Sequence, residues 1–150
     1  MRVTKAIREY IEDQVKLKTK SQLEEIEAQI KKWDDDLEVQ KNKFKALGNK
    51  EITKFATALY PKLQKITPKD TTFYLSFWNR RGETLEDFIG GFTEFFEDKI
   101  RFKYTNPYTE KKQKFINLRE QKITEIILQL ELGAKREELQ EMLSNIVIEV

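Results

Sequence analysis

Side chains that could act as nucleophiles, bases or metal ligands are limited to a few types in this chain. Its 150 residues include no cysteine and no histidine, which excludes thiolate nucleophiles, Ser-His pairs and most zinc sites. Carboxylates bind Mg²⁺ or Ca²⁺, but acidic residues in the first turn of a helix are also explained by the helix dipole. The sequence therefore predicts no catalytic residue, no metal site, no cofactor and no enzymatic activity. The densest carboxylate group is Glu83, Glu86, Asp87, Glu94, Glu97 and Asp98.

A second chemical candidate is the basic segment 99–122, which carries eight basic and two acidic side chains. Lysine and arginine neutralise phosphate, and aromatic rings stack on bases for about 1–3 kcal/mol each. The alternative is a solvated basic face opposite buried rings, which the strict alternation of basic and aromatic side chains favours. A strongly basic domain would favour nucleic acid, but the net charge of this chain is only +2. The candidate nucleic-acid ligands are Lys99, Arg101, Lys103, Lys111, Lys112 and Lys114, with Tyr104 and Tyr108 as stacking platforms.

Arg80 and Arg81 form a third candidate, in a predicted turn that directly follows Trp78 and Asn79. Two guanidinium groups beside an indole ring can bind a phosphate or a carboxylate of a partner. The alternative is an ordinary polar turn whose arginines pair with the acidic residues that follow. Nucleic-acid binding by these arginines and the basic segment is thus the alternative function.

Charge is unevenly distributed along the second half of the chain. The net charge is +5 over residues 49–82, −6 over 83–98 and +6 over 99–122. If the acidic and basic segments pair within one molecule, much of this patchiness is internal. Pairing of that kind weakens the case for both protein and nucleic-acid binding through charge.

The clearest pattern is a heptad of large side chains with alternating spacings of three and four. That spacing places them on one stripe of a helix, which predicts packing along its length against another helix. The second helix belongs either to the same chain, in an antiparallel hairpin, or to a second copy. The stripe is the predicted site of self-association or partner docking. Its members are Leu23, Ile26, Ile30, Trp33, Leu37, Phe44 and Leu47, with the polar Gln40 between Leu37 and Phe44.

The helices that carry these residues follow from periodicity and end signals. A first helix covers about residues 3–17, and a break at 18–21 is expected because Ser21 and Glu24 have the spacing of a capping box. A second helix reaches Leu47, where Gly48-Asn49 is expected to end it. A third covers 50–66 and is kinked or split by Pro61.

The period then changes to two. Residues 71–78 and 100–104 alternate apolar and polar side chains, which predicts two strands, with a helix capped by Thr84 between them. Helices follow from about Thr109 to Leu132-Gly133 and over 135–145, and the β-branched tail 146–150 is either a strand or a helical extension. The expected fold is mainly α with a small β element (α+β). It is a single domain, 1–150, with a protruding helical hairpin or coiled coil at 1–48 and a mixed α/β body at 49–150.

The sequence predicts a non-enzymatic interaction or assembly protein, with a protein partner or a second copy of itself as ligand. Small chains rich in lysine and glutamate and free of cysteine are common among accessory proteins of phages and other mobile elements. The first residues lack the apolar core of a signal peptide, and no run of about 18 apolar residues occurs. A cytoplasmic protein without a membrane partner is therefore expected.

Overall fold

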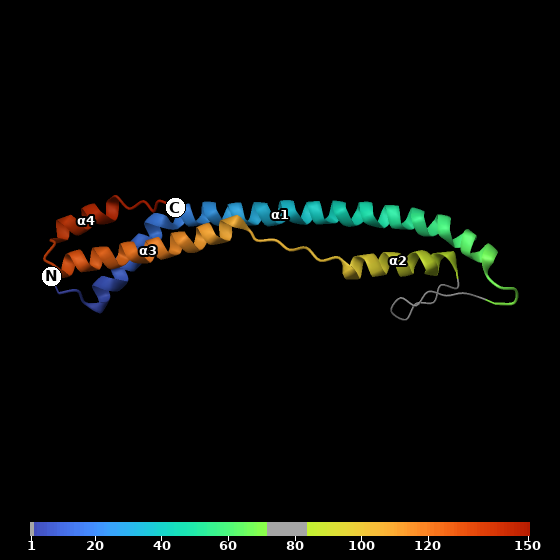
Figure 1. Cartoon of the computed structure of the whole chain (residues 1–150). Coiled ribbons are helices and arrows are strands. Elements are labelled where there is room, and N and C mark those ends of the chain that lie inside the picture. The colour runs from blue at the N-terminus through green and yellow to red at the C-terminus, as the bar shows by residue number, and fades with distance from the viewer. Residues whose placement is uncertain (1, 72–83) are drawn as a thin grey trace. The chain divides into compact units, whose positions relative to one another are not determined.

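The computed structural model describes residues 2–71 and 84–150 (Figure 1). Within these ranges the helices are α1 (Lys5–Ile66), α2 (Leu85–Lys99), α3 (Pro107–Glu131) and α4 (Arg136–Ser144), and no strand is present. The chain divides into two compact units. Unit 1 is residues 1–35 with 105–150, and unit 2 is residues 36–104. The boundary expected at residue 48 falls inside unit 2.

Helix α1 is continuous, so the break predicted at residues 18–21 is wrong. Thr19 is fully buried, and its hydroxyl donates to the carbonyl of Val15 at 2.7 Å, one helical turn back. A polar residue at this position is therefore satisfied inside the helix and continues the buried stripe from Ile11 and Val15. Ser21, the expected cap, lies within the helix.

The stop predicted at Gly48-Asn49 is also wrong, and so is the separate helix over 50–66. A Cβ atom on Gly48 would clash with Cζ of the Phe96 ring. Glycine is therefore needed here because the ring of α2 packs directly on the backbone of α1. That packing offsets the cost of a helical glycine, about 1 kcal/mol. Helix α1 likewise contains Pro61 and is not split by it.

Gly48→Ala is expected to destabilise the protein by about 1 kcal/mol, against the usual preference for alanine in helices. Alanine gains about 1 kcal/mol of helix propensity, but it displaces the Phe96 ring and loses about 2 kcal/mol of its burial. Urea denaturation measures the difference. The control is Ala46→Gly at an exposed position of α1, where glycine should cost about 1 kcal/mol. A Gly48→Ala variant more stable than the parent would show that the ring has room to move.

In unit 1, α3 runs antiparallel to the first part of α1 (Figure 1). The start of α3 lies at Ile30, because the Asn106 side chain donates to the Ile30 carbonyl at 3.1 Å. The end of α3 lies near the start of α1, where Arg8 pairs with Glu131 at 3.2 Å. The core between these helices includes Phe115 and other fully buried side chains, which makes burial the main source of stability here. Its members on the three helices are Ile11, Val15, Ile26, Phe115, Ile123, Ile126, Ile127, Leu130, Leu139 and Leu143.

The end of α3 at Gly133 was expected and is confirmed. Gly133 has a φ of 110°, and the amides of Gly133 and Ala134 donate to the carbonyls of Leu130 and Gln129. This is the Schellman arrangement, which glycine favours because its left-handed conformation costs nothing there. Helix α4 follows as expected over 136–144 and packs back on the same core.

The tail 146–150 is neither a strand nor an extension of α4. It lies outside any helix or strand, and its Ile146 and Ile148 are buried in the core of unit 1. The side-chain amide of Gln22 holds it, since it donates to the Ile148 carbonyl at 2.9 Å and accepts from the Ile148 amide at 3.3 Å. One glutamine therefore supplies the two hydrogen bonds that a neighbouring strand would make.

In unit 2, α2 and residues 36–66 of α1 form an antiparallel hairpin. Ring pairs mark its register, with centroids 5.2 Å apart for Tyr60–Phe88 and 5.9 Å apart for Phe55–Phe92. The cap predicted at the start of α2 is confirmed, because the Thr84 hydroxyl accepts from the amide three residues later at 3.1 Å. The two consecutive glycines at 90 and 91 lie within α2 and do not break it.

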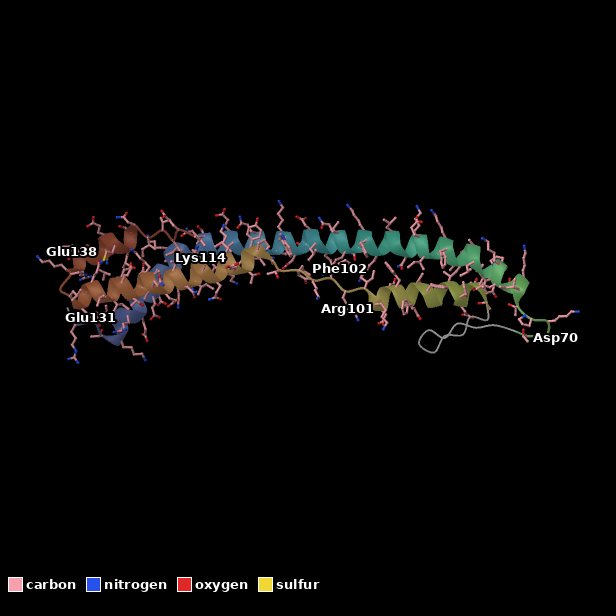
Figure 2. The ribbon with its side chains drawn as sticks, in the orientation of Figure 1. Asp70, Arg101, Phe102, Lys114, Glu131 and Glu138 are labelled. Carbon is pink, nitrogen blue, oxygen red and sulfur yellow. The ribbon has the colours of Figure 1, made fainter. Side chains whose placement is uncertain are left out.

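The expected α+β class is wrong, because all regular secondary structure in the described ranges is helical. Residues 101–105 lie outside any helix or strand and do not pair with a second strand. The ring of Phe102 points toward α1, while Arg101 points away from it (Figure 2). The alternation of apolar and basic side chains in this segment therefore arises because one side packs on a helix and the other side faces solvent. The other predicted strand, over 71–78, lies outside the described residues apart from Thr71.

Candidate protein-interaction surface

The structure divides the predicted heptad stripe into parts with different environments. Leu23, Ile26 and Ile30 pack in the core of unit 1, where Ile26 is 5% exposed. These three residues therefore have an intramolecular role, on the side of α1 that faces α3. Trp33 and Leu37 follow and are half-buried.

The last part of the stripe lies in unit 2 and is largely exposed. Phe44 is 53% exposed and Leu47 is 63% exposed. Phe55 lies on the same side of α1 three turns after Phe44, because eleven residues span three helical turns, and it is 57% exposed. We call Phe44, Leu47 and Phe55 the exposed stripe. Sequence reasoning missed Phe55 as a surface residue, because the expected stop at Gly48 placed it on a different helix.

Aromatic contacts support the exposed stripe from the side of α2. The ring of Phe44 stacks on Phe96 with centroids 6.3 Å apart and meets the edge of Phe102 at 5.4 Å. The ring of Phe55 meets Phe92 edge to face at 5.9 Å. Each ring is therefore held on one side and open on the other, which is the arrangement of a preorganised contact residue.

Among the residues that the structure describes, unit 1 has more buried apolar side chains than unit 2. The core of unit 1 contains side chains from three helices and the tail. In the described part of unit 2, the buried apolar side chains are Ala56, Tyr60 and Phe88. A helix hairpin buries one side of each helix, so large side chains outside the contact line stay in solvent. Outside residues 72–83, the exposed large apolar residues of unit 2 are Val39, Phe44, Leu47, Phe55, Ile66, Phe95 and Tyr104.

The two helices of unit 2 carry opposite charge. Residues 36–66 of α1 contain seven lysines and three acidic residues, a net charge of +4. Helix α2 contains five acidic residues and one lysine, a net charge of −4. The acidic segment thus packs beside a basic helix, and part of the charge patchiness of the sequence is internal to unit 2. A polar contact joins the helices at Asn49, whose side chain donates to Glu97 at 2.8 Å.

The basic segment 99–122 is not one surface element. Residues 99–104 belong to unit 2, and residues 105–122 belong to unit 1. In unit 1, Lys112 pairs with Glu27 at 3.1 Å and Lys111 donates to Gln29 at 3.4 Å. These two lysines therefore hold α3 against α1. Tyr108 is half-buried in the first turn of α3, and Lys114 is exposed.

In unit 2 the candidate nucleic-acid ligands also have intramolecular contacts. The ammonium of Lys41 lies 4.2 Å from the ring centroid of Tyr104 and occupies one of its faces. Lys99 lies 6.0 Å from the ring of Phe95. The Arg101 guanidinium donates to the carbonyls of Asp98 and Ile100. Lys103 is exposed, and Arg80 and Arg81 lie outside the described residues.

Over residues 2–71 and 84–150, no group of three or more acidic side chains is placed to hold a metal ion. In the same ranges no helix combines the length and the low polarity that a membrane span needs. Comparison of the chain with protein-family models, with curated proteins and with solved structures found no match.

Proposed function

We propose that this chain is a non-enzymatic interaction or assembly protein, and that it binds its partner through the exposed stripe of unit 2. The observation that carries the proposal is the exposure of Phe44, Leu47 and Phe55, each more than half accessible on one side of α1. Exposed apolar groups clustered among charged residues mark interaction sites. Aromatic anchors that are already fixed by neighbouring rings lose little entropy on binding.

The role that fits such a surface is that of a small accessory protein that recruits or assembles other chains. A cytoplasmic location and an origin in a phage or other mobile element stay part of this proposal, as expected from the composition. Leu37, which also belongs to unit 2, is half-buried and can extend the contact along α1.

Site-specific photo-crosslinking tests the proposal. A benzoylphenylalanine in place of Leu47 should form adducts in cells that make the chain together with its natural neighbours. The matched control is the same group in place of Leu17, which lies on the same helix in unit 1 and has the same 63% exposure. Adducts at position 47 and none at 17 support the surface. Equal yields at both positions, or none at 47, would refute it.

Nucleic-acid binding is the weaker hypothesis, because several of the side chains proposed to bind nucleic acid make contacts within the chain. We expect a fluorescent single-stranded oligonucleotide to bind weakly at low salt, with an affinity that depends little on salt. A protein that neutralises several phosphates loses affinity steeply as salt rises. Fluorescence anisotropy over a salt series measures this. A steep loss that Lys103→Ala and Lys114→Ala reduce would restore nucleic-acid binding as the main function.

A further inference from the structure

We infer that the partner of the exposed stripe is a second copy of this chain, bound through the same stripe. This inference rests on the proposed function and names the ligand of that surface. It places Phe44, Leu47 and Phe55 of both copies in one apolar contact. The two hairpins of unit 2 then form a four-helix arrangement, the commonest way in which amphipathic hairpins cover their remaining apolar sides.

The charges of unit 2 favour a second copy over an unrelated partner. One helix of the hairpin has a net charge of +4 and the other has a net charge of −4. A partner of a single sign would match one helix and be repelled by the other. A second copy related by a two-fold axis matches both, because the charges of each helix that do not face its neighbour in the hairpin can lie opposite the other helix of the second copy. The surface is in this sense self-complementary.

The exposed stripe also has the composition that a symmetric contact needs. An isologous interface brings the same residues together from both copies, so a charge on the axis would meet its own copy. Phe44 and Leu47 are uncharged and lie one helical turn apart. Glu51 lies between Leu47 and Phe55 on the same side of α1 and pairs with Lys54 at 3.4 Å, so its charge is balanced within each copy. The two-fold axis therefore falls at Phe44 and Leu47, and the charged side chains lie around them.

Light scattering on a sizing column, over a series of protein concentrations, tests the inference on the full chain. The parent should approach twice the 18.0 kDa mass of one chain. Leu47→Lys should shift the midpoint of association at least tenfold to higher concentration, since it places two ammonium groups at the centre. Leu47 is 63% exposed, so the variant should keep the parent helix content, which circular dichroism checks. Phe55→Lys should act in the same way.

The matched control is Leu17→Lys, the same substitution at the same 63% exposure on α1 but in unit 1. It should leave the dimer intact. A parent chain that is monomeric at every concentration, or equal effects of Leu47→Lys and Leu17→Lys, would overturn the inference. Adducts of the Leu47 photoprobe then separate the two proposals. With a monomeric chain, a specific adduct to another protein overturns the second copy and keeps the interaction surface, whereas no adduct overturns both.

Discussion

Asn106→Ala is expected to lower the free energy of unfolding by about 3 kcal/mol. Asn106 is 8% exposed, and its side chain makes three hydrogen bonds. Its side-chain oxygen accepts from the Tyr108 amide at 3.0 Å, which caps α3, and its side-chain nitrogen donates to the Ile30 carbonyl and to Asp34, both at 3.1 Å. A lost cap costs about 1 kcal/mol, and each further bond is worth about 1 kcal/mol. Thermal and urea denaturation measure the loss.

Asn106→Asp separates capping from the bonds to α1. Aspartate keeps a good capping oxygen, but it replaces the donor with a carboxylate that faces the carboxylate of Asp34. The variant should therefore remain destabilised, and Asp34→Asn in the same chain should recover part of the loss by restoring a donor. Asn117→Ala is the control, because Asn117 is exposed on α3 and accepts a single bond from Gln113. It should change stability by less than about 0.5 kcal/mol. Equal effects at positions 106 and 117 would contradict the prediction.

The second large effect is expected in the tail. Replacing both Ile146 and Ile148 with alanine should destabilise unit 1 by about 4 kcal/mol, since each Ile→Ala change in a core costs at least about 2 kcal/mol. Ile146 is 7% exposed and Ile148 is 6% exposed. Hydrogen exchange should show faster opening of α4, because Leu139 and Leu143 share this core with the tail.

The controls for the tail are its own exposed residues. Val147 is 68% exposed and Val150 is 42% exposed, so changing both to alanine should alter stability by less than about 1 kcal/mol. A loss of similar size in both double variants would mean that the tail does not pack with the alternation that the structure shows. If replacing the two isoleucines lowered the free energy of unfolding by less than about 1 kcal/mol, the tail would not be part of the core.

The sequence predicted one part of the interaction surface and missed another. The stripe up to Leu47 was recognised from its spacing, and Phe44 and Leu47 remain candidates for the contact. Phe55 was not assigned to the stripe, because Gly48 signals a helix end. The ring of Phe96, which occupies the space where a side chain at position 48 would lie, comes much later in the chain. A helix stop is a local preference of about 1 kcal/mol, which the packing of a single aromatic ring exceeds.

The sequence by itself determined the elements that depend on near neighbours. Helical periodicity predicted most of the helical segments, and Thr84 and Gly133 marked a start and an end, whereas the strand predicted over 100–104 is absent. These signals are local, since capping and side-chain periodicity act over one or two turns. The sequence did not show that Asn106-Pro107 starts α3, although asparagine followed by proline is a common cap.

Only the tertiary structure decided which segments pack together. It placed Leu23, Ile26 and Ile30 in an intramolecular core and left Phe44 and Leu47 exposed. Residues 100–104, which were predicted to pair with a strand, pack on α1 instead through Phe102 and Phe44. The tail is held by the side chain of Gln22. The physical reason is that alternation and heptads specify which side of a segment is apolar, whereas the partner of that side is chosen by long-range packing.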